Sequence, residues 1–321
     1  MILLTGATGL IGSALLRELV AEGRQVRAIC RQPQGNTHGV EWVQGDVRDL
    51  ASLQKAMEGV THVFHCAGLV SFAPRDKQLL YKVNVEGTAN VVNVCLAVPG
   101  VKLCHVSSVA AIGKLPGETF PDENSRWEAQ QGHSQYAASK HWGEAEVWRG
   151  VAEGLDAVIV NPSIVLGGAD AGRSSTKLLG YVASEKMFYI EGQSNFVDLR
   201  DVTEAMRRLM FSDIRSERYI LNAGALPYRQ FFTLAAQCLQ KRPPQVKLPL
   251  ALARAMAKAE QFRSWLTGAR PLITPDTVNR TKDSIEYRAA KVTKAVGLTF
   301  KPLEETVSWA CGQLRNAANG G

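Results

Sequence analysis

The chain opens with Met1-Ile2-Leu3-Leu4-Thr5-Gly6-Ala7-Thr8-Gly9-Leu10-Ile11-Gly12. Its first apolar residues predict a buried parallel strand, and apolar residues follow at helical spacing from Leu10 to Leu19. Gly6, Gly9 and Gly12 fall in the turn between strand and helix, where they permit a tight turn and a close approach to a diphosphate. The helix N-terminus there offers unpaired N–H groups to an anion. An ordinary glycine-rich turn can carry the same letters, but its position directly after a strand favours a dinucleotide site.

The composition and charge of the chain exclude several classes of protein. The net charge of +7 is spread over the sequence, without the Lys/Arg-rich runs that bind nucleic acid. No apolar run reaches the roughly 18 residues of a membrane span, and a strand that begins at the first residue leaves no room for a signal peptide. The cysteines have no CxxC spacing, so we expect neither a metal site nor disulfides. We therefore expect a cytoplasmic protein with no nucleic-acid or membrane partner.

Strand and helix patterns alternate through the first half of the chain. The predicted strands are 25–30, 40–44, 61–66, 101–107 and 155–160, and the predicted helices are 50–57, 78–97 and 135–152. This alternation predicts an α/β fold with a doubly wound parallel sheet, the Rossmann fold. The carboxyl ends of all strands then lie at one edge of the sheet, where ligands bind.

The alternation breaks after residue 162. We expect a loop-and-helix excursion over 163–196, followed by a helix at 201–211 and a short strand at 219–221 that return to the sheet. Beyond residue 223 the pattern is almost wholly helical, with candidates at 248–266, 275–281, 289–296 and 303–314. These patterns predict a dinucleotide-binding domain made of 1–162 and about 197–222, and a smaller, mostly helical substrate lobe made of 163–196 and 223–321.

The end of the second strand indicates which dinucleotide binds. Sites for NAD usually carry an acidic residue there for the ribose hydroxyls, whereas this strand ends in Cys30-Arg31-Gln32. A guanidinium at Arg31 suits a 2′-phosphate, which predicts NADP(H), with NAD(H) as the alternative. Asp46 ends the third strand at the same edge; it can accept from the adenine amino group or cap the following turn, and we favour the adenine role.

Tyr136-Ala137-Ala138-Ser139-Lys140 is the candidate for catalysis. A tyrosine and a lysine four residues apart share one face of a helix, and a nearby ammonium lowers the pKa of a phenol. Tyr136 is thereby a credible proton donor or acceptor at a carbonyl or alcohol. This spacing also occurs by chance in solvated helices, but Ser107-Ser108 at the end of the fifth strand adds a hydroxyl that can hold the substrate oxygen.

Several motifs in the first 225 residues resemble, in correct order, the extended short-chain dehydrogenase/reductase family. They are Thr5-Gly6-Ala7-Thr8-Gly9-Leu10-Ile11-Gly12, Asp46-Val47, Cys66-Ala67-Gly68, Asn84-Val85-Glu86-Gly87-Thr88, Ser107-Ser108, Tyr136-xxx-Lys140 and Asn161-Pro162. The resemblance implies a nicotinamide site with Ser108, Tyr136 and Lys140 as the catalytic set. The predicted cofactor contacts are Gly6, Thr8, Gly9, Leu10, Ile11, Gly12, Arg31, Asp46, Val47, Cys66, Ala67, Gly68, Asn84, Ser107, Tyr136, Lys140, Pro162 and Ile164.

The chain departs from the family pattern at two places. Asn161 replaces the arginine of the family's Arg-Pro segment, so the ion pair of the usual arginine is expected to be absent. Asp198 stands where histidine is usual, and we expect Asp201 to cap the helix that follows. The predicted substrate contacts are Ser71, Ala110, Asn161, Arg173 and Tyr189.

The segments 26–31 and 296–302 resemble the dihydroflavonol-reductase-like branch of the family. Val109-Ala110-Ala111 after the serine pair suits a small, fairly apolar carbonyl substrate. The prediction is therefore an NADP(H)-dependent oxidoreductase that transfers hydride with a Ser-Tyr-Lys proton relay. A nucleotide-sugar epimerase with tightly bound NAD(P) is the alternative enzyme, and a non-catalytic NADP-binding redox sensor is the alternative of another class. The family also makes a homodimer possible.

Overall fold

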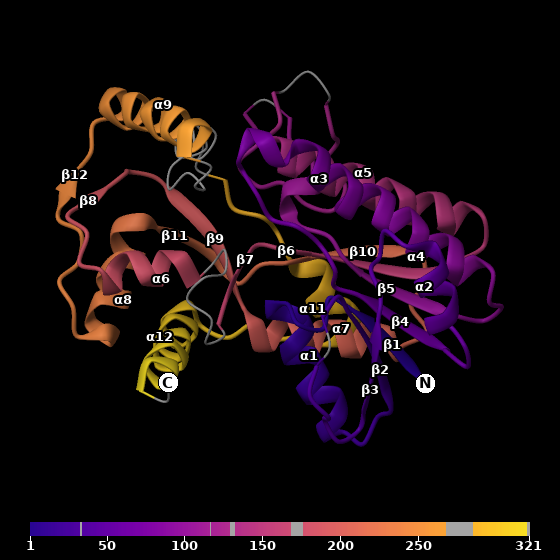
Figure 1. Cartoon of the computed structure of the whole chain (residues 1–321). Coiled ribbons are helices and arrows are strands. Elements are labelled where there is room, and N and C mark those ends of the chain that lie inside the picture. The colour runs from indigo at the N-terminus through magenta and orange to yellow at the C-terminus, as the bar shows by residue number, and fades with distance from the viewer. Residues whose placement is uncertain (33, 116, 129–131, 168–175, 268–284, 320–321) are drawn as a thin grey trace.

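A seven-stranded parallel sheet forms the centre of the computed structural model, which describes all residues except 33, 116, 129–131, 168–175, 268–284 and 320–321 (Figure 1). The strand order is β10-β6-β5-β4-β1-β2-β3, and every neighbouring pair is parallel. The strands are β1 (Ile2–Thr5), β2 (Val26–Cys30), β3 (Val40–Gln44), β4 (His62–His65), β5 (Lys102–Val106), β6 (Asp156–Pro162) and β10 (Glu217–Leu221). The predicted return of 219–221 to the sheet is confirmed.

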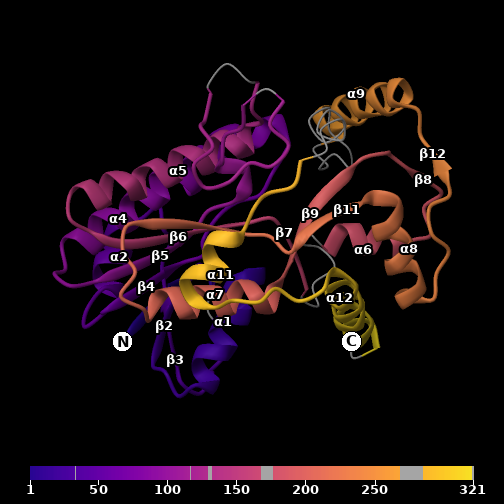
Figure 2. The ribbon, with the colours of Figure 1, turned by 180° about the vertical axis from the view of Figure 1, so that it is seen from behind.

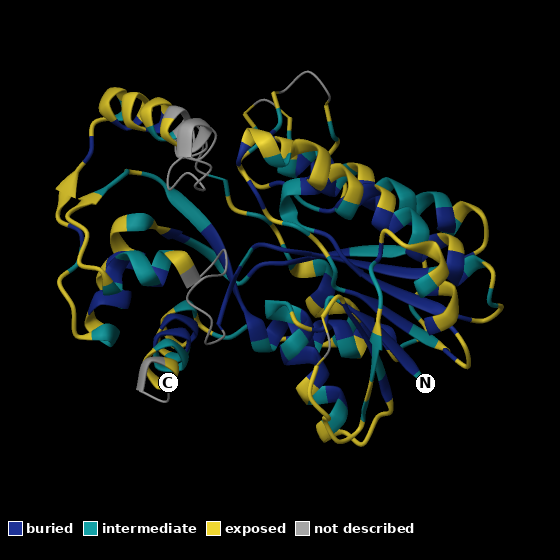
Figure 3. Ribbon diagram, viewed as in Figure 1, coloured by how far each residue is buried: buried dark blue, intermediate teal, exposed yellow. Residues whose placement is uncertain are grey.

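Helices cover both faces of this sheet (Figures 1 and 2). One face carries α1 (Leu10–Ala21), α7 (Leu199–Met210) and α11 (Ala290–Val296), and the other carries α2 (Leu50–Ala56), α4 (Gly87–Leu96) and α5 (Gln135–Ala152). The inner strands are mostly apolar and lie largely buried between the helix layers (Figure 3). The predicted doubly wound sheet is confirmed.

The long helix predicted at 78–97 is interrupted. A 3-10 turn (Pro74–Asp76) leads into α3 (Lys77–Tyr81), a π-helical turn η2 (Lys82–Glu86) follows, and α4 completes the run. A π-helical turn inserts one extra residue into a helix and often marks a functional site. Here it contains Asn84, whose side chain is buried beneath the sheet edge.

The remainder of the chain folds around two small sheets. β7 (Ile164–Leu166), β9 (Gln193–Asp198) and β11 (Gly224–Pro227) form the order β11-β9-β7, and β8 (Phe188–Tyr189) pairs with β12 (Val246–Lys247). The described helices that pack around them are α6 (Thr176–Ala183), α8 (Tyr228–Leu239), α9 (Leu250–Thr267) and α12 (Leu303–Asn319).

These strands show where the predicted secondary structure was wrong. In the part of the chain that the structure describes, the excursion contains β7, β8 and the start of β9 besides its helix, and the region beyond 223 contains β11 and β12 as well as helices. The longest of the five has six residues, too few for a period-two pattern to stand out against apolar helices. The helix predicted at 275–281 lies outside the described residues.

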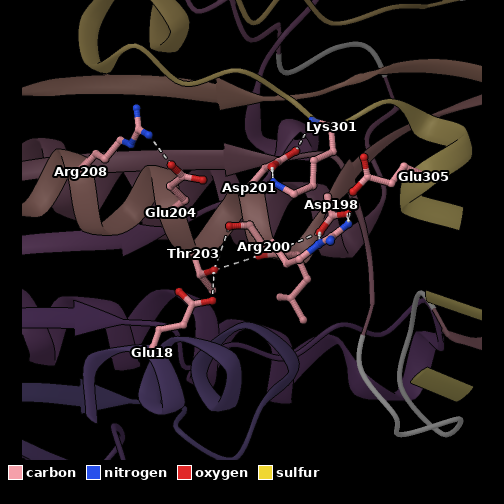
Figure 4. Close-up of polar contacts among 10 residues, drawn as sticks. Glu18, Asp198, Arg200, Asp201, Thr203, Glu204, Arg208, Lys301 and Glu305 are labelled. Carbon is pink, nitrogen blue, oxygen red and sulfur yellow. Dashed lines mark hydrogen bonds and ion pairs between the residues drawn. The ribbon is translucent and has the colours of Figure 1, made fainter. Parts of the chain in front are cut away.

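Two aspartates lie at the start of α7, and the cap of the helix is not the one that was expected (Figure 4). Asp198 is the N-cap, because its Oδ1 accepts from the Arg200 backbone N–H at 2.8 Å. Asp201 is fully buried and accepts from the backbone N–H of Lys301 at 2.8 Å and from its Nζ at 3.0 Å. The prediction that Asp201 caps α7 is therefore wrong, and this carboxylate instead attaches the segment before α12 to the helix.

Part of the C-terminal region packs against the main sheet. Val292 of α11 and Leu298 are buried in the same core as α1 and α7. We therefore keep the division into a dinucleotide-binding domain and a substrate lobe as a proposal, with α11 added to the former. Among the described helices, none is long and apolar enough to cross a membrane.

Candidate active site

The glycine loop between β1 and α1 is packed too tightly for side chains. A β-carbon at Gly6 would lie 2.5 Å from the Ala67 backbone nitrogen, and one at Gly12 would lie 2.2 Å from the Gly6 carbonyl oxygen. Gly9 is the N-cap of α1 and provides no side-chain acceptor to the first turn. The helix therefore begins with N–H groups directed at the sheet edge and no acid nearby, an arrangement that fits a diphosphate.

Lys140 is buried at the same edge of the sheet. Only 5% of the residue is exposed, and its Nζ donates to the Val106 carbonyl oxygen at the end of β5, at 2.7 Å. Burial lowers the pKa of Lys140 to about 8, an effect that the carboxylate of Glu144, one helical turn along, partly opposes. An amine of this kind can change its protonation state near neutral pH, as a proton relay requires.

Asn84 and Ser139 connect the π-helical turn to the catalytic helix. The Asn84 side chain donates to Ser139 Oγ at 2.9 Å, and that hydroxyl donates to the Tyr136 carbonyl oxygen at 2.8 Å. Asn84 also exchanges two hydrogen bonds with the Leu69 backbone, which holds the loop after β4. The helices meet closely because α5 has Gly143 at the contact, where a β-carbon would lie 2.1 Å from the Asn84 carbonyl oxygen.

The two serines after β5 differ in their surroundings. Ser108 is half-buried, and its Oγ accepts from the Ala110 N–H at 3.1 Å, so it caps the turn while its O–H can still donate to a ligand. Ser107 is buried, and its Oγ has no hydrogen-bond partner within the described residues. The Oγ of Ser163, after β6, is in the same state. Unpaired hydroxyls at this edge fit a polar group such as the carboxamide of nicotinamide.

Tyr136 lies in the first turn of α5, which Ser134 caps by accepting from the Ala137 N–H. Its ring meets Phe72 edge to face, with 5.5 Å between the ring centroids. Ser71 beside it is buried and donates to Asp76 Oδ2 at 2.6 Å, so its hydroxyl already serves the loop. Among these side chains, the half-exposed Phe72 is the one placed to meet a ligand next to Tyr136.

Arg31 and Asp46 lie together at the ends of β2 and β3. Hydrogen bonds from Arg48 lower the pKa of Asp46, and the charge of the exposed Arg31 adds a smaller effect in the same direction. Arg48 binds the Asp46 carboxylate twice, at 3.0 Å to Oδ1 and 2.7 Å to Oδ2, and its backbone N–H donates to Oδ1. The carboxylate thus makes the turn-capping contacts that were the alternative to an adenine contact.

The other predicted residues divide into two groups. The first group lies at or just after the carboxyl ends of the strands of the main sheet, or opens the element that follows. Its members are Thr8 after β1, Leu10 and Ile11 at the start of α1, Val47 after β3, Cys66, Ala67 and the exposed Gly68 after β4, Pro162 at the end of β6, and Ile164 at the start of β7. Ala110 lies in the turn after Ser108, and Asn161 is fully buried in β6. Tyr189 lies apart from them in β8, at the outer side of the second lobe (Figure 1), and Arg173 lies outside the described residues.

The structure also contains groups that sequence reasoning missed. Glu144 is 3% exposed and forms an ion pair with Arg218 of β10, at 3.1 Å. Glu144 lies four residues after Lys140, a spacing visible in the sequence, whereas no pattern indicated Arg218. His65 and His105 lie side by side under Lys140, fully buried, and burial lowers the pKa of His65 to about 3.

Comparisons with known proteins agree with this geometry. A family model described as "NAD dependent epimerase/dehydratase family" matches residues 2–224. A protein of Synechocystis sp. named "Putative dihydroflavonol 4-reductase" is 29% identical over 97% of this chain and 94% of its own length. "Sterol demethylase protein B" of Methylococcus capsulatus is 30% identical over 79% of each chain. The structure titled "Crystal structure of gox2253" superposes with a TM-score of 0.83, at 29% identity and 98% coverage of each chain.

Proposed function

Because the chain belongs to the NAD-dependent epimerase/dehydratase family and is an oxidoreductase of the short-chain dehydrogenase/reductase kind, we propose that it is an NADP(H)-dependent reductase. Its substrate is a small, fairly apolar carbonyl compound, or the corresponding alcohol in the reverse direction. The glycine loop would hold the diphosphate, and residues at the ends of β4, β5 and β6 would hold the nicotinamide. The bound dinucleotide supplies or accepts the hydride.

The protein's part in the reaction is to hold the substrate oxygen and to move its proton. Ser108 donates a hydrogen bond to the oxygen, and Tyr136 gives it a proton during reduction. Lys140 favours the phenolate that remains and supports Tyr136 from one helical turn away. In oxidation the same groups act in reverse, with Tyr136 as the base.

The burial of Lys140 is the observation that carries this proposal. A YxxxK pair on an ordinary solvated helix face keeps its lysine in water, because desolvating an ammonium is costly. Here the ammonium is 5% exposed and bonded to the Val106 carbonyl oxygen, beside the loop that carries Ser108. The desolvated ammonium of Lys140 lies at the edge of the sheet where ligands bind in this fold, as expected for a functional amine.

The apolar character of the substrate has two supports. Phe72 lies against Tyr136, and Val109, Ala110 and Ala111 follow Ser108 without an acidic side chain. The names of the two relatives refer to a dihydroflavonol and a sterol, both of which are ring compounds. Together these favour a ketone or aldehyde attached to an apolar frame.

The preference for NADP(H) depends on Arg31, since no carboxylate stands at the end of β2 to receive ribose hydroxyls. Replacing Arg31 by Ala should weaken NADPH binding and leave NADH binding unchanged. The control is Arg215→Ala, an exposed arginine near the start of β10, at the opposite edge of the sheet. An NADPH preference that survives Arg31→Ala would show that another group recognises the phosphate.

The proposed reaction is tested with a panel of ketones, aldehydes and nucleotide sugars, each assayed by NADPH consumption. Tyr136→Phe should abolish turnover of any substrate found, whereas Tyr81→Phe, at an exposed tyrosine of α3, should not. A purified protein that retains an unexchanged dinucleotide and interconverts nucleotide sugars would establish the epimerase instead. Unchanged cellular function in Tyr136→Phe would indicate a sensor.

A further inference from the structure

A buried polar chain links the catalytic helix to the outermost strand of the sheet. Asn161 of β6 donates from its single Nδ2 to the Ser108 carbonyl oxygen at 3.0 Å and to Glu144 Oε2 at 2.7 Å. The other oxygen of Glu144 accepts from Arg218 Nη1 at 3.1 Å. The chain therefore runs from the Ser108 peptide through α5 to β10, and Asn161 and Glu144 are almost completely excluded from water.

Arg218 extends the chain to the loop before α5. Its guanidinium donates to the Glu123 carbonyl oxygen, with 2.8 Å from Nε, and the Glu123 side chain accepts from the Ile220 N–H at 2.9 Å. Glu123 is itself buried, and burial raises its pKa. One arginine thus connects α5, β10 and the segment that precedes the catalytic helix.

The charge arrangement explains how Asn161 is tolerated. A buried carboxylate such as Glu144 needs a cation or several donors, because a buried and unpaired charge strongly destabilises a protein. The family pattern has an arginine at position 161, and in this chain the guanidinium comes from the neighbouring strand. The buried Glu144 carboxylate therefore has a cationic partner, although position 161 carries no arginine. Asn161 then has room to bind both Glu144 and the Ser108 peptide.

We propose that Arg218 is a positioning residue, which fixes the Ser108 peptide and the Lys140 turn of α5 by holding Glu144 and, through it, Asn161. The inference rests on the proposed reductase function. Arg218 acts through Glu144 and Asn161, and we assign it no part in proton or hydride transfer. It determines whether the Ser108 hydroxyl reaches the substrate oxygen and whether the Lys140 ammonium reaches the Tyr136 phenol.

Turnover of a substrate found in the panel gives the first test. Arg218→Met should reduce kcat by about 100-fold, the effect of a misplacement near 1 Å, with little change in the KM for NADPH. Adding Asn161→Arg to Arg218→Met should restore much of kcat, because the new guanidinium returns a cation to Glu144 from β6 and has further N–H groups that can donate to the Ser108 carbonyl oxygen in place of the amide. Asn161→Arg alone should not raise kcat. A wild-type kcat in Arg218→Met, or no rescue by Asn161→Arg, would overturn the proposal.

A purely stabilising pair is distinguished by removing both charges. Glu144→Met with Arg218→Met replaces a buried pair by apolar side chains of similar length, a change that is often neutral for folding. The proposal requires this double variant to unfold at the wild-type urea concentration and to keep a low kcat. Recovery of both stability and kcat would show that the pair only stabilises the fold and would overturn the proposal.

A third measurement needs no substrate and so separates this inference from the proposed function. Competitive acylation of Lys140 over a pH series, quantified by mass spectrometry, gives the pKa of Lys140 in the folded protein. Burial lowers the pKa of Lys140 most, and the charges of Glu144 and Cys66 act in the opposite direction. Glu144→Gln should lower the pKa, and Arg218→Met should raise it, because the carboxylate is no longer neutralised.

The control for acylation is Arg215→Met, which removes an exposed arginine near the start of β10 and should leave Lys140 unchanged. Opposite shifts in Glu144→Gln and Arg218→Met support the coupling even if no carbonyl compound in the panel is turned over. In that case the proposed reductase function has failed while Arg218 still acts on the Lys140 turn. Identical acylation curves in wild type and Arg218→Met would overturn the inference.

Discussion

Replacing Gly143 by Ala tests how closely the catalytic helix must approach the π-helical turn. A β-carbon at this position would lie 2.1 Å from the Asn84 carbonyl oxygen, whereas such contacts are essentially never shorter than 3.0 Å. The Asn84 oxygen belongs to the backbone, so the clash cannot be relieved by rotating a side chain. Helix α5 and the π-helical turn must therefore separate by about 0.9 Å, the difference between these two distances.

The expected cost to stability is small because two effects oppose each other. Overpacking of a close contact costs about 1–3 kcal/mol, and alanine is favoured over glycine inside a helix by about 1 kcal/mol. We expect a net loss of about 1 kcal/mol in the free energy of unfolding. The effect on catalysis is larger, because Lys140 lies one turn before Gly143 and a displacement near 1 Å can reduce kcat by about 100-fold.

Urea unfolding and steady-state kinetics with NADPH measure these two quantities on the same variant. The matched control is Gly312→Ala in α12, where a β-carbon would meet no atom within 4 Å. That control should gain up to about 1 kcal/mol of stability and keep its kcat. If Gly143→Ala is as stable and as active as Gly312→Ala, the close helix contact does not position Lys140 and the reasoning is refuted.

Three further changes have defined outcomes. Burial lowers the pKa of Lys140 from its ordinary value of 10.5 to about 8. At a pH between these two values, the folded protein therefore binds fewer protons than the unfolded chain. The free energy of unfolding should therefore rise with pH in that window, by at most about 3 kcal/mol, and Lys140→Met should remove the rise in urea titrations. Asp201→Ala should destabilise the protein by about 1–3 kcal/mol in the same assay, more than Asp49→Ala at the exposed cap of α2, since it removes a buried carboxylate contact. Gly12→Ala should abolish dinucleotide binding in calorimetry, because its β-carbon would lie 2.2 Å from a backbone oxygen of the phosphate loop; unchanged affinity would contradict this.

The main sheet could be predicted because its signals are local. Most inner strands are short, largely apolar runs and the covering helices have apolar stripes, so burial on one or two faces appears directly in the residue order. The glycine loop, the Tyr136–Lys140 spacing and the serines after β5 are also contiguous motifs. Their common location follows from the topology, since parallel strands bring their carboxyl ends to one edge.

The second lobe could not be predicted in the same way. Its strands β7, β8, β9, β11 and β12 have two to six residues, and they form only by pairing with segments distant in the chain. The choice between Asp198 and Asp201 as cap of α7 was equally undecidable from the letters. Both are acids near the helix start, and the buried Lys301 contact, 100 residues away, assigns their roles.

The interior of the candidate site depends on the same long-range contacts. Lys140 stands in a recognisable motif, but its low exposure and lowered pKa arise from the strands and loops packed over it. The ion pair of Glu144 joins residues 74 positions apart, so no periodicity or spacing could reveal Arg218 as the partner. The local order of apolar and polar residues indicates which side chains are buried and which belong to reactive motifs. Desolvation and charge pairing are properties of the packed chain, because they depend on neighbours that only folding brings together.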